Sequence, residues 1–189
     1  MAMATYVALL RGINVSGHNP IAMKDLKALF EGLPAEEVTT YLQSGNVVFR
    51  SAAAGPGEPP DADALAEDVG AQIAAQLGLK VAVLVRPAEE FTQVVAANPF
   101  LTADRDWSGL HLTFLAQPPD PARVAALEAA PVAAGPDAFR LGEREVYLYC
   151  PGGYGRTKLN NAFFEKKLAL AATTRNWRTV TTLADLARR

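Results

Sequence analysis

The chain has 189 residues, which is enough for one domain or for two small domains packed together. Half of the residues are hydrophobic and a fifth are charged, a composition that excludes wholesale disorder and fibrous repeats. The net charge of -2 argues against nucleic acid coating the whole surface, although a local basic patch fits within a nearly neutral total.

The sequence carries no signal for a membrane or a metal. No apolar run approaches the ~20 residues that span a bilayer, and the N-terminal residues do not form a secretion signal, so we expect a cytoplasmic protein with no membrane partner. The lone Cys150 cannot form an internal disulfide or a cysteine-based metal cluster, and His18 and His111 are not a metal-spaced pair. We therefore assign neither a metal nor a cofactor.

Charge is distributed unevenly along the chain. Residues 1–138 hold eight Lys and Arg against sixteen Asp and Glu, whereas residues 139–189 hold ten against four. Basic side chains of the last quarter that share one face would attract phosphates or other anions. The alternative is that helix lysines such as Lys166 and Lys167 form an ordinary solvated surface, and the sequence leaves both interpretations open.

The first half of the chain predicts the order strand, helix, strand, strand, helix, strand. The first helix is expected to end at a left-handed Gly32, and the second to begin at Asp61 or Asp63 and to end at Gly78. Gly, Pro and Ala dominate residues 51–63, which predicts an exposed connection. The predicted elements are a strand at 5–10, a helix with apolar residues at 23, 26, 29 and 30, strands at 38–42 and 46–50 joined by a tight hairpin, a helix marked by Leu65, Val69, Ile73 and Leu77, and a strand at 80–86.

The second half repeats this order less completely. A connecting helix is expected to start at Pro87 and to end at Asn98 and Pro99. No final strand is evident, and in its place stand TTRNWRT (173–179) and a terminal helix. The other predicted elements are strands at 111–116, 138–141 and 145–150 and helices at 121–130 and 161–170.

The order of the elements predicts the fold class. Strand, helix, strand, strand, helix, strand is the order of a split βαβ, ferredoxin-like unit, in which we expect the final strand to lie between its earlier partners. The sequence thus predicts an α+β fold with two ferredoxin-like halves, residues 1–86 and 87–189, packed together in one compact unit. No sequence repeat supports a duplication.

The segment CPGGYGRTKLNN, residues 150–161, is the richest in candidate chemistry. Its glycines allow backbone N–H groups to approach a ligand, the start of the following helix adds donors with partial positive charge, and Arg156 and Lys158 add full charges. Because Leu159 rather than Ser or Thr follows Lys158, the segment is not a Walker A loop. The alternative is a surface loop that is rich in glycine for mobility.

Two further segments combine polar side chains with turns. In RGINVSGHN (11–19), Arg11 can pair with a phosphate or carboxylate of a ligand, or equally with a buried acid. TTRNWRT places donors beside an aromatic face that suits a planar or phosphorylated ligand, although Trp177 can instead fill the core. The predicted ligand-binding residues are Arg11, Asn14, Asn46, Gly153, Tyr154, Arg156, Lys158, Arg175 and Asn176.

Signals for catalysis or for nucleic-acid binding are weaker. His111 begins a strand, where packing is the favoured role, and Cys150 is expected to be an inert buried thiol rather than a nucleophile. An enzyme would use Tyr154 or Lys158 as its general acid, and nothing in the spacing demands this. Tyr147 and Tyr149 share one strand face, but the signature of RNA-recognition domains is missing.

Four segments together resemble the domain-of-unknown-function 1697 family: RGINV (11–15), TYLQSGNVVF (40–49), YGRTKL (154–159) and TTRNWRTV (173–180). The resemblance implies a compact bacterial α/β protein of ferredoxin-like halves, in agreement with the predicted strand order. It implies no reaction and no catalytic or binding residues. We therefore expect a protein that binds a small anionic ligand, with an enzyme of unknown reaction and a nucleic-acid or protein interaction module as alternatives.

Overall fold

The structure is a computed structural model that describes residues 3–52, 60–102, 106–129 and 135–189. Its contacts group the chain into two compact units, Met1–Gln93 with Thr182–Arg189, and Val94–Thr181. Each unit contains one four-stranded antiparallel sheet and helices, so the predicted α+β class is confirmed. Most of the exposed connection expected at residues 51–63 lies outside the described residues.

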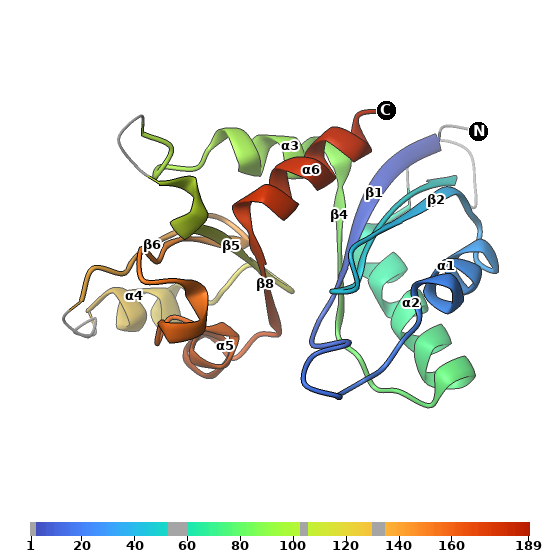
Figure 1. Ribbon diagram of the computed structural model, residues 1–189, viewed down its shortest axis with the longest axis horizontal. Coiled ribbons are helices and arrows are strands. Elements are labelled where there is room, and N and C mark those ends of the chain that lie inside the picture. Colours follow the sequence, from blue (N-terminus) through green and yellow to red (C-terminus); the bar gives the residue numbers. More distant parts are fainter. Residues whose placement is uncertain (1–2, 53–59, 103–105, 130–134) are drawn as a thin grey trace. The chain divides into compact units, whose positions relative to one another are not determined.

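The first unit is a ferredoxin-like sheet with two helices on one face (Figure 1). The strand order is β2-β3-β1-β4, so β4 lies at the sheet edge beside β1, and β3 is the strand inserted between β1 and β2. The expectation that the final strand lies between its partners was therefore wrong. The elements are β1 (Met3–Leu10), α1 (Met23–Glu31), β2 (Ala35–Tyr41), β3 (Asn46–Ala52), α2 (Ala62–Leu77) and β4 (Val83–Pro87), followed by α3 (Ala88–Ala96).

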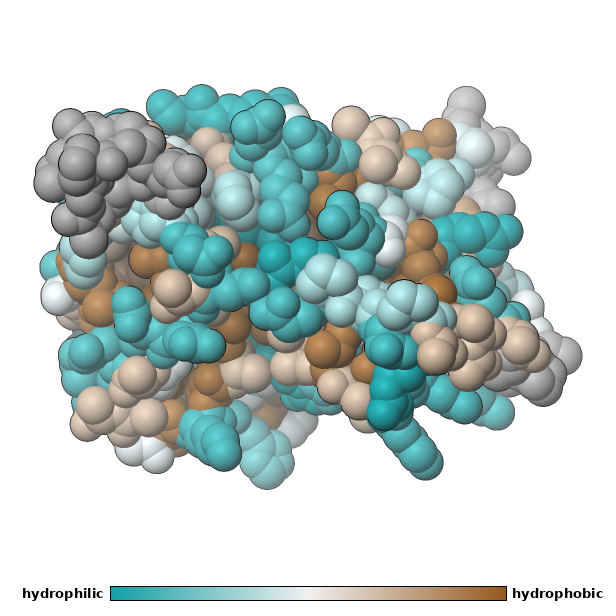
Figure 2. Space-filling view, turned by 180° about the vertical axis from the view of Figure 1, so that it is seen from behind, coloured by the Kyte–Doolittle hydropathy of each residue, from teal (hydrophilic) through white to brown (hydrophobic). Residues whose placement is uncertain are grey.

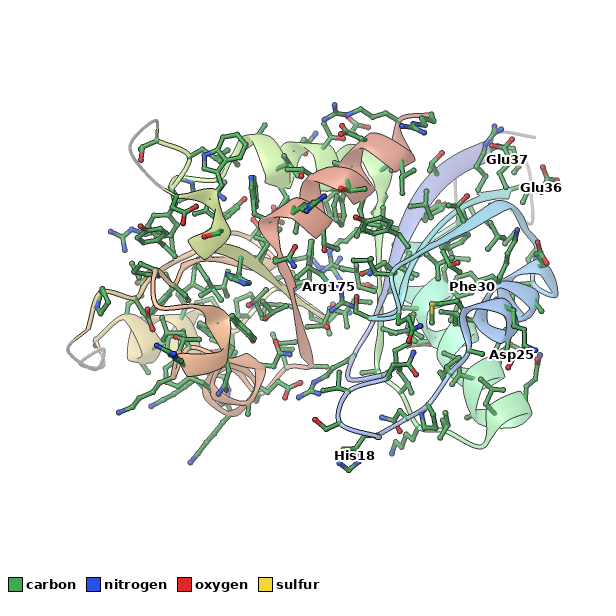
Figure 3. The ribbon with its side chains drawn as sticks, viewed as in Figure 1. His18, Asp25, Phe30, Glu36, Glu37 and Arg175 are labelled. Carbon is green, nitrogen blue, oxygen red and sulfur yellow. The ribbon has the colours of Figure 1, made fainter. Side chains whose placement is uncertain are left out.

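Alternation along β1 explains the core of this unit. Tyr6, Ala8 and Leu10 point to the face that α1 and α2 cover, as successive strand residues must face opposite sides. Phe30 of α1 is fully buried against this face and packs edge-on against Phe49 of β3 (Figure 3). The helical spacing of apolar residues therefore sets which side of each helix meets the sheet.

Two of the predicted helix ends differ from the structure. Gly78 is left-handed with φ of 67°, and the Asp61 side chain caps α2 by accepting from the backbone N–H groups of Asp63 and Ala64, as expected. Gly32, however, has φ of -81°, a right-handed conformation that any residue can adopt, so the end of α1 does not require a glycine there.

The start of α3 also differs from the prediction. Pro87 is the last residue of β4 rather than the first residue of α3. Its ring-fixed φ suits either position, so proline alone cannot locate this boundary. The helix ends at Ala96, slightly earlier than expected.

The second unit repeats the same strand topology with the order β6-β7-β5-β8. The final strand that the sequence did not reveal is β8, which pairs antiparallel with β5 through Thr113 and Thr174. Its sequence, ATTRN, is short and mostly polar, so it lacks the apolar pattern that identifies a strand. The elements are η1 (Trp107–Gly109), β5 (Leu110–Leu115), α4 (Pro121–Ala129), β6 (Ala138–Leu141), β7 (Glu145–Tyr149), η2 (Tyr154–Arg156), α5 (Asn161–Leu168), β8 (Ala172–Asn176) and α6 (Trp177–Ala187).

The two faces of this sheet differ in chemistry. Leu115 of β5, Leu148 of β7 and Ala172 of β8 belong to the hydrophobic core that includes Phe164 of α5. By alternation, Thr174 and Asn176 lie on the same face as Ala172, whereas Arg175 lies on the opposite face. Adjacent residues of TTRNWRT therefore serve different sides of the sheet.

Surface hydrophobicity is limited on the face of the molecule that Figure 2 shows, where hydrophilic residues surround small groups of hydrophobic ones. Within the described ranges, none of the helices is long and apolar enough to cross a bilayer. Trp107 is 58% exposed, an unusual position for so large an aromatic side chain. Among the described residues, the other exposed large hydrophobic side chains are Val15, Leu42 and Leu101.

Candidate functional site

Asn14 and Asn46 of the first unit are used to hold the backbone together. The Asn14 amide Nδ2 donates to the carbonyl oxygens of Ile21 at 2.9 Å and Gln43 at 2.8 Å, and its Oδ1 accepts from the Ile21 N–H. The fully buried Asn46 donates through Nδ2 to the Tyr41 carbonyl oxygen at 2.7 Å. Both amides therefore fasten the loop after β1 and the β2–β3 hairpin.

Arg11 and His18 flank the same loop. Arg11 is half-buried, and its backbone N–H donates to the Ala82 carbonyl oxygen at 2.9 Å. His18 lies exposed at the end of the loop (Figure 3).

The glycine loop of the second unit has one anchored side chain and two exposed basic ones. The Tyr154 hydroxyl donates to Thr174 Oγ1 at 3.1 Å and accepts from the Asn161 N–H at 3.2 Å. Thr174 Oγ1 in turn donates to Asn161 Oδ1 at 2.6 Å. Arg156 and Lys158 are exposed. The loop is thus fixed through its tyrosine, and its two cations remain at the surface.

The ring of His111 stacks on the Tyr154 ring, with centroids 5.0 Å apart and planes at 25°. His111 Nδ1 lies 3.2 Å from the carbonyl oxygen of Gly109. Because a carbonyl oxygen only accepts, this contact requires the hydrogen on Nδ1 and leaves Nε2 with its lone pair in the neutral ring. The side chain is only 8% exposed, and burial lowers its pKa more than the Gly109 contact raises it.

An open pocket of about 520 Å³ lies between η1 and the first turn of α6, in the second unit. Asn176 stands at the start of α6, where its Oδ1 accepts from the Thr179 N–H at 2.8 Å. The first turn of a helix presents N–H groups with partial positive charge. The pocket is lined by Trp107, Ser108, His111, Asn176, Trp177, Arg178 and Thr181.

The pocket contains one of the residues predicted to bind ligand, Asn176. Tyr154 lies behind His111 and does not line the pocket itself. Gly153, Arg156 and Lys158 belong to the loop that carries Tyr154, and the remaining predicted residues of the first unit are Arg11, Asn14 and Asn46.

By strand alternation, Arg175 lies on the sheet face opposite Thr174 and Asn176. Its Nη1 donates to Thr173 Oγ1 at 2.8 Å and to the Thr174 carbonyl oxygen at 3.0 Å. Burial lowers its pKa to about 10, so the guanidinium keeps its charge at neutral pH. Arg175 is thus a buried cation on the opposite face of the sheet from Asn176, which lines the pocket.

The sequence did not predict the part of the site formed by η1 and the first residues of β5. It assigned packing to His111 and gave no role to Trp107 or Ser108, which line the pocket. One signal was present: His111 and Thr113 share a strand face with Leu115, and two polar side chains on the core face of an apolar strand indicate a polar contact there.

Burial of His111 predicts a pH dependence of stability. Since its pKa in the folded protein is lowered below the unfolded value of about 6.5, the unfolded chain takes up a proton more readily as the pH falls through that range. The wild type should therefore lose more unfolding free energy between pH 7 and pH 5 than His111→Phe, which keeps an aromatic ring on Tyr154. Urea titrations at the two pH values test this, and equal losses would contradict it. The neighbouring ionisable side chains, Tyr154 and Arg178, are present in both proteins.

Cys150 is fully buried in the core of the second unit. Burial raises the pKa of its thiol more than the hydrogen bond with Thr157 lowers it. We expect a disulfide reagent such as DTNB to react with the native protein at least about a hundredfold more slowly than with the unfolded chain, because access needs local opening. The chain has one cysteine, so the absorbance change reports this site alone. Comparable rates in the two states would show an accessible thiolate.

Comparison with known proteins identifies a family and a similar fold. A family model described as "Protein of unknown function (DUF1697)" matches residues 3–147. This range covers the first unit up to α3 and continues through β5 to most of β7, and it ends before the glycine loop. No curated protein matches the chain.

The structure of the conserved bacterial protein SP0830 from Streptococcus pneumoniae is similar to this chain. It aligns with a TM-score of 0.73 and 22% identity over 98% of this chain and 99% of its own. At this identity the similarity supports the fold and carries no residue roles.

Proposed function

This chain belongs to the DUF1697 family, whose description names no activity, and we propose from the pocket that it binds a small anionic ligand that carries a phosphate or resembles a nucleotide. The observation that carries the proposal is that Arg178, in the first turn of α6, and the exposed Trp107 line one pocket. Arginine and a helix N-terminus both favour a phosphate, and an indole ring favours a planar group.

Pocket size and polarity agree with such a ligand. About 520 Å³ lies within the range of small-molecule sites, which is roughly 300–1,000 Å³. Ser108, Asn176 and Thr181 supply polar groups along its wall. Arg156 and Lys158 lie on the loop whose tyrosine stacks against His111, and their positive charge would raise the local concentration of an anion.

Thermal unfolding of the full chain at low salt tests this proposal. Inorganic phosphate and adenosine 5′-monophosphate (AMP) should each raise the melting temperature with concentration, because a ligand that binds only the folded state stabilises it by mass action. Chloride at matched ionic strength is the control for general salt effects. A melting temperature that is unchanged by both ligands up to millimolar concentration would reject the proposal.

A further inference from the structure

We infer that His111 determines which anions the pocket accepts, by taking a hydrogen bond on Nε2 from a hydroxyl group of the ligand, and that the preferred class is a nucleoside monophosphate with a free ribose hydroxyl. The inference rests on the proposed function, since it names the ligand class for the same pocket. It starts from the one polar side chain in the pocket wall that is more than nine-tenths buried.

The hydrogen bond at Nδ1 of His111 determines whether Nε2 donates or accepts. Nδ1 lies 3.2 Å from the Gly109 carbonyl oxygen and must donate to it. Nε2 of the neutral ring is then an acceptor, and no residue in the described part of the chain forms a hydrogen bond with it. His111 lines the pocket, so this acceptor can take a hydrogen bond from a ligand that enters there.

The His111 ring is also held in place before a ligand arrives. One face stacks on Tyr154, and the Tyr154 hydroxyl is fixed between Thr174 and Asn161. Thr174 is tied to the sheet by a 2.7 Å contact between its Oγ1 and Thr113 Oγ1. A fixed acceptor discriminates between ligands better than a mobile one, because little ordering cost is paid on binding.

The three kinds of group around the pocket match three parts of one ligand. A fully ionised phosphate oxygen is repelled by the lone pair of Nε2, so the phosphate belongs with Arg178 and the first turn of α6. The hydroxyl belongs with His111, and the exposed ring of Trp107 offers a stacking surface for a base. A nucleoside monophosphate contains all three, and the pocket volume of about 520 Å³ admits it.

A matched pair of ligands tests this inference. AMP and 2′,3′-dideoxyadenosine monophosphate share the phosphate and the base and differ only in the ribose hydroxyls. By isothermal titration, the wild type should bind the dideoxy compound about tenfold more weakly, the usual effect of losing one hydrogen bond. His111→Phe should lower the affinity for AMP to that for the dideoxy compound, and it should leave the affinity for the dideoxy compound unchanged. Ribose 5-phosphate should bind more weakly than AMP, since it lacks the base.

The outcomes separate the two proposals. Equal affinity of the wild type for AMP and its dideoxy analogue would overturn the role of His111 and leave anion binding standing. Binding of neither nucleotide, with no response to phosphate, would overturn both. If His111→Phe fails to fold, the imidazole ¹⁵N resonances of the wild-type protein test the inference instead. His111 should show Nδ1 protonated and an Nε2 signal that moves on adding AMP, whereas His18, in the other unit, should not respond. An Nε2-protonated ring would contradict the inference.

Discussion

Gly45→Ala is expected to lower the free energy of unfolding by about 3 kcal/mol, because the new methyl group has no room and the backbone is left-handed. A Cβ atom at this position would lie 2.7 Å from Ile13 Cδ1 and 2.8 Å from Leu10 Cβ. Both neighbours are fully or almost fully buried, so neither can move aside cheaply. Urea unfolding of the two proteins measures the difference.

Gly17→Ala is the matched control for that change. Gly17 and Gly45 both have φ of +78°, but a Cβ at Gly17 would meet nothing within 4 Å. In the control, alanine adds backbone strain of about 1 kcal/mol but no steric clash. The stabilisation that comes from a less flexible unfolded chain is the same in both variants. A loss at Gly45 no larger than the loss at Gly17 would show that the loop after β1 does not pack against the hairpin as described.

Arg178→Ala is expected to weaken AMP binding by about 10- to 100-fold, since it removes a charge-assisted hydrogen bond to the phosphate. The arginine lines the pocket in the first turn of α6, where the helix end also favours an anion. Isothermal titration at fixed low ionic strength gives the affinities, and circular dichroism shows whether the variant keeps its fold.

Lys158→Ala removes the same unit of charge from an exposed side chain outside the pocket wall. Its effect on AMP affinity should stay within about twofold, as expected for a screened surface charge. Equal losses for Arg178→Ala and Lys158→Ala would mean that net charge, and not this pocket, attracts the ligand. A larger loss for Lys158→Ala would place the site in the glycine loop.

Much of the fold was predictable because most elements carry a local signal. The apolar run of β1 indicates a buried strand, and the glycine after α2 indicates the end of a helix. Both signals can be read from neighbouring residues alone. The strand β8 escaped prediction because its polar side chains bond to one another and to the loop, as Thr174 does with Tyr154 and Asn161. Such a strand is stabilised by partners distant in sequence, which a local pattern does not show.

The candidate site was predictable in part. TTRNWRT was identified as a mixture of donors and an aromatic face, and its Asn176, Trp177 and Arg178 line the pocket. Strand alternation turns Arg175 to the other face, a separation that depends on knowing that β8 is a strand. His111 joins the site through its pairing with Asn176 across β5 and β8, and residue spacing cannot reveal that register.

The most direct test of anion binding in this pocket uses the indole N–H signals of the protein. The chain has two tryptophans, and both Trp107 and Trp177 line the pocket, so a ¹H–¹⁵N spectrum reports on it through two resolved signals. Titration with AMP should shift both signals along saturable curves with a single dissociation constant. Indole signals that stay in place at millimolar AMP, while the protein remains folded, would contradict the proposed site.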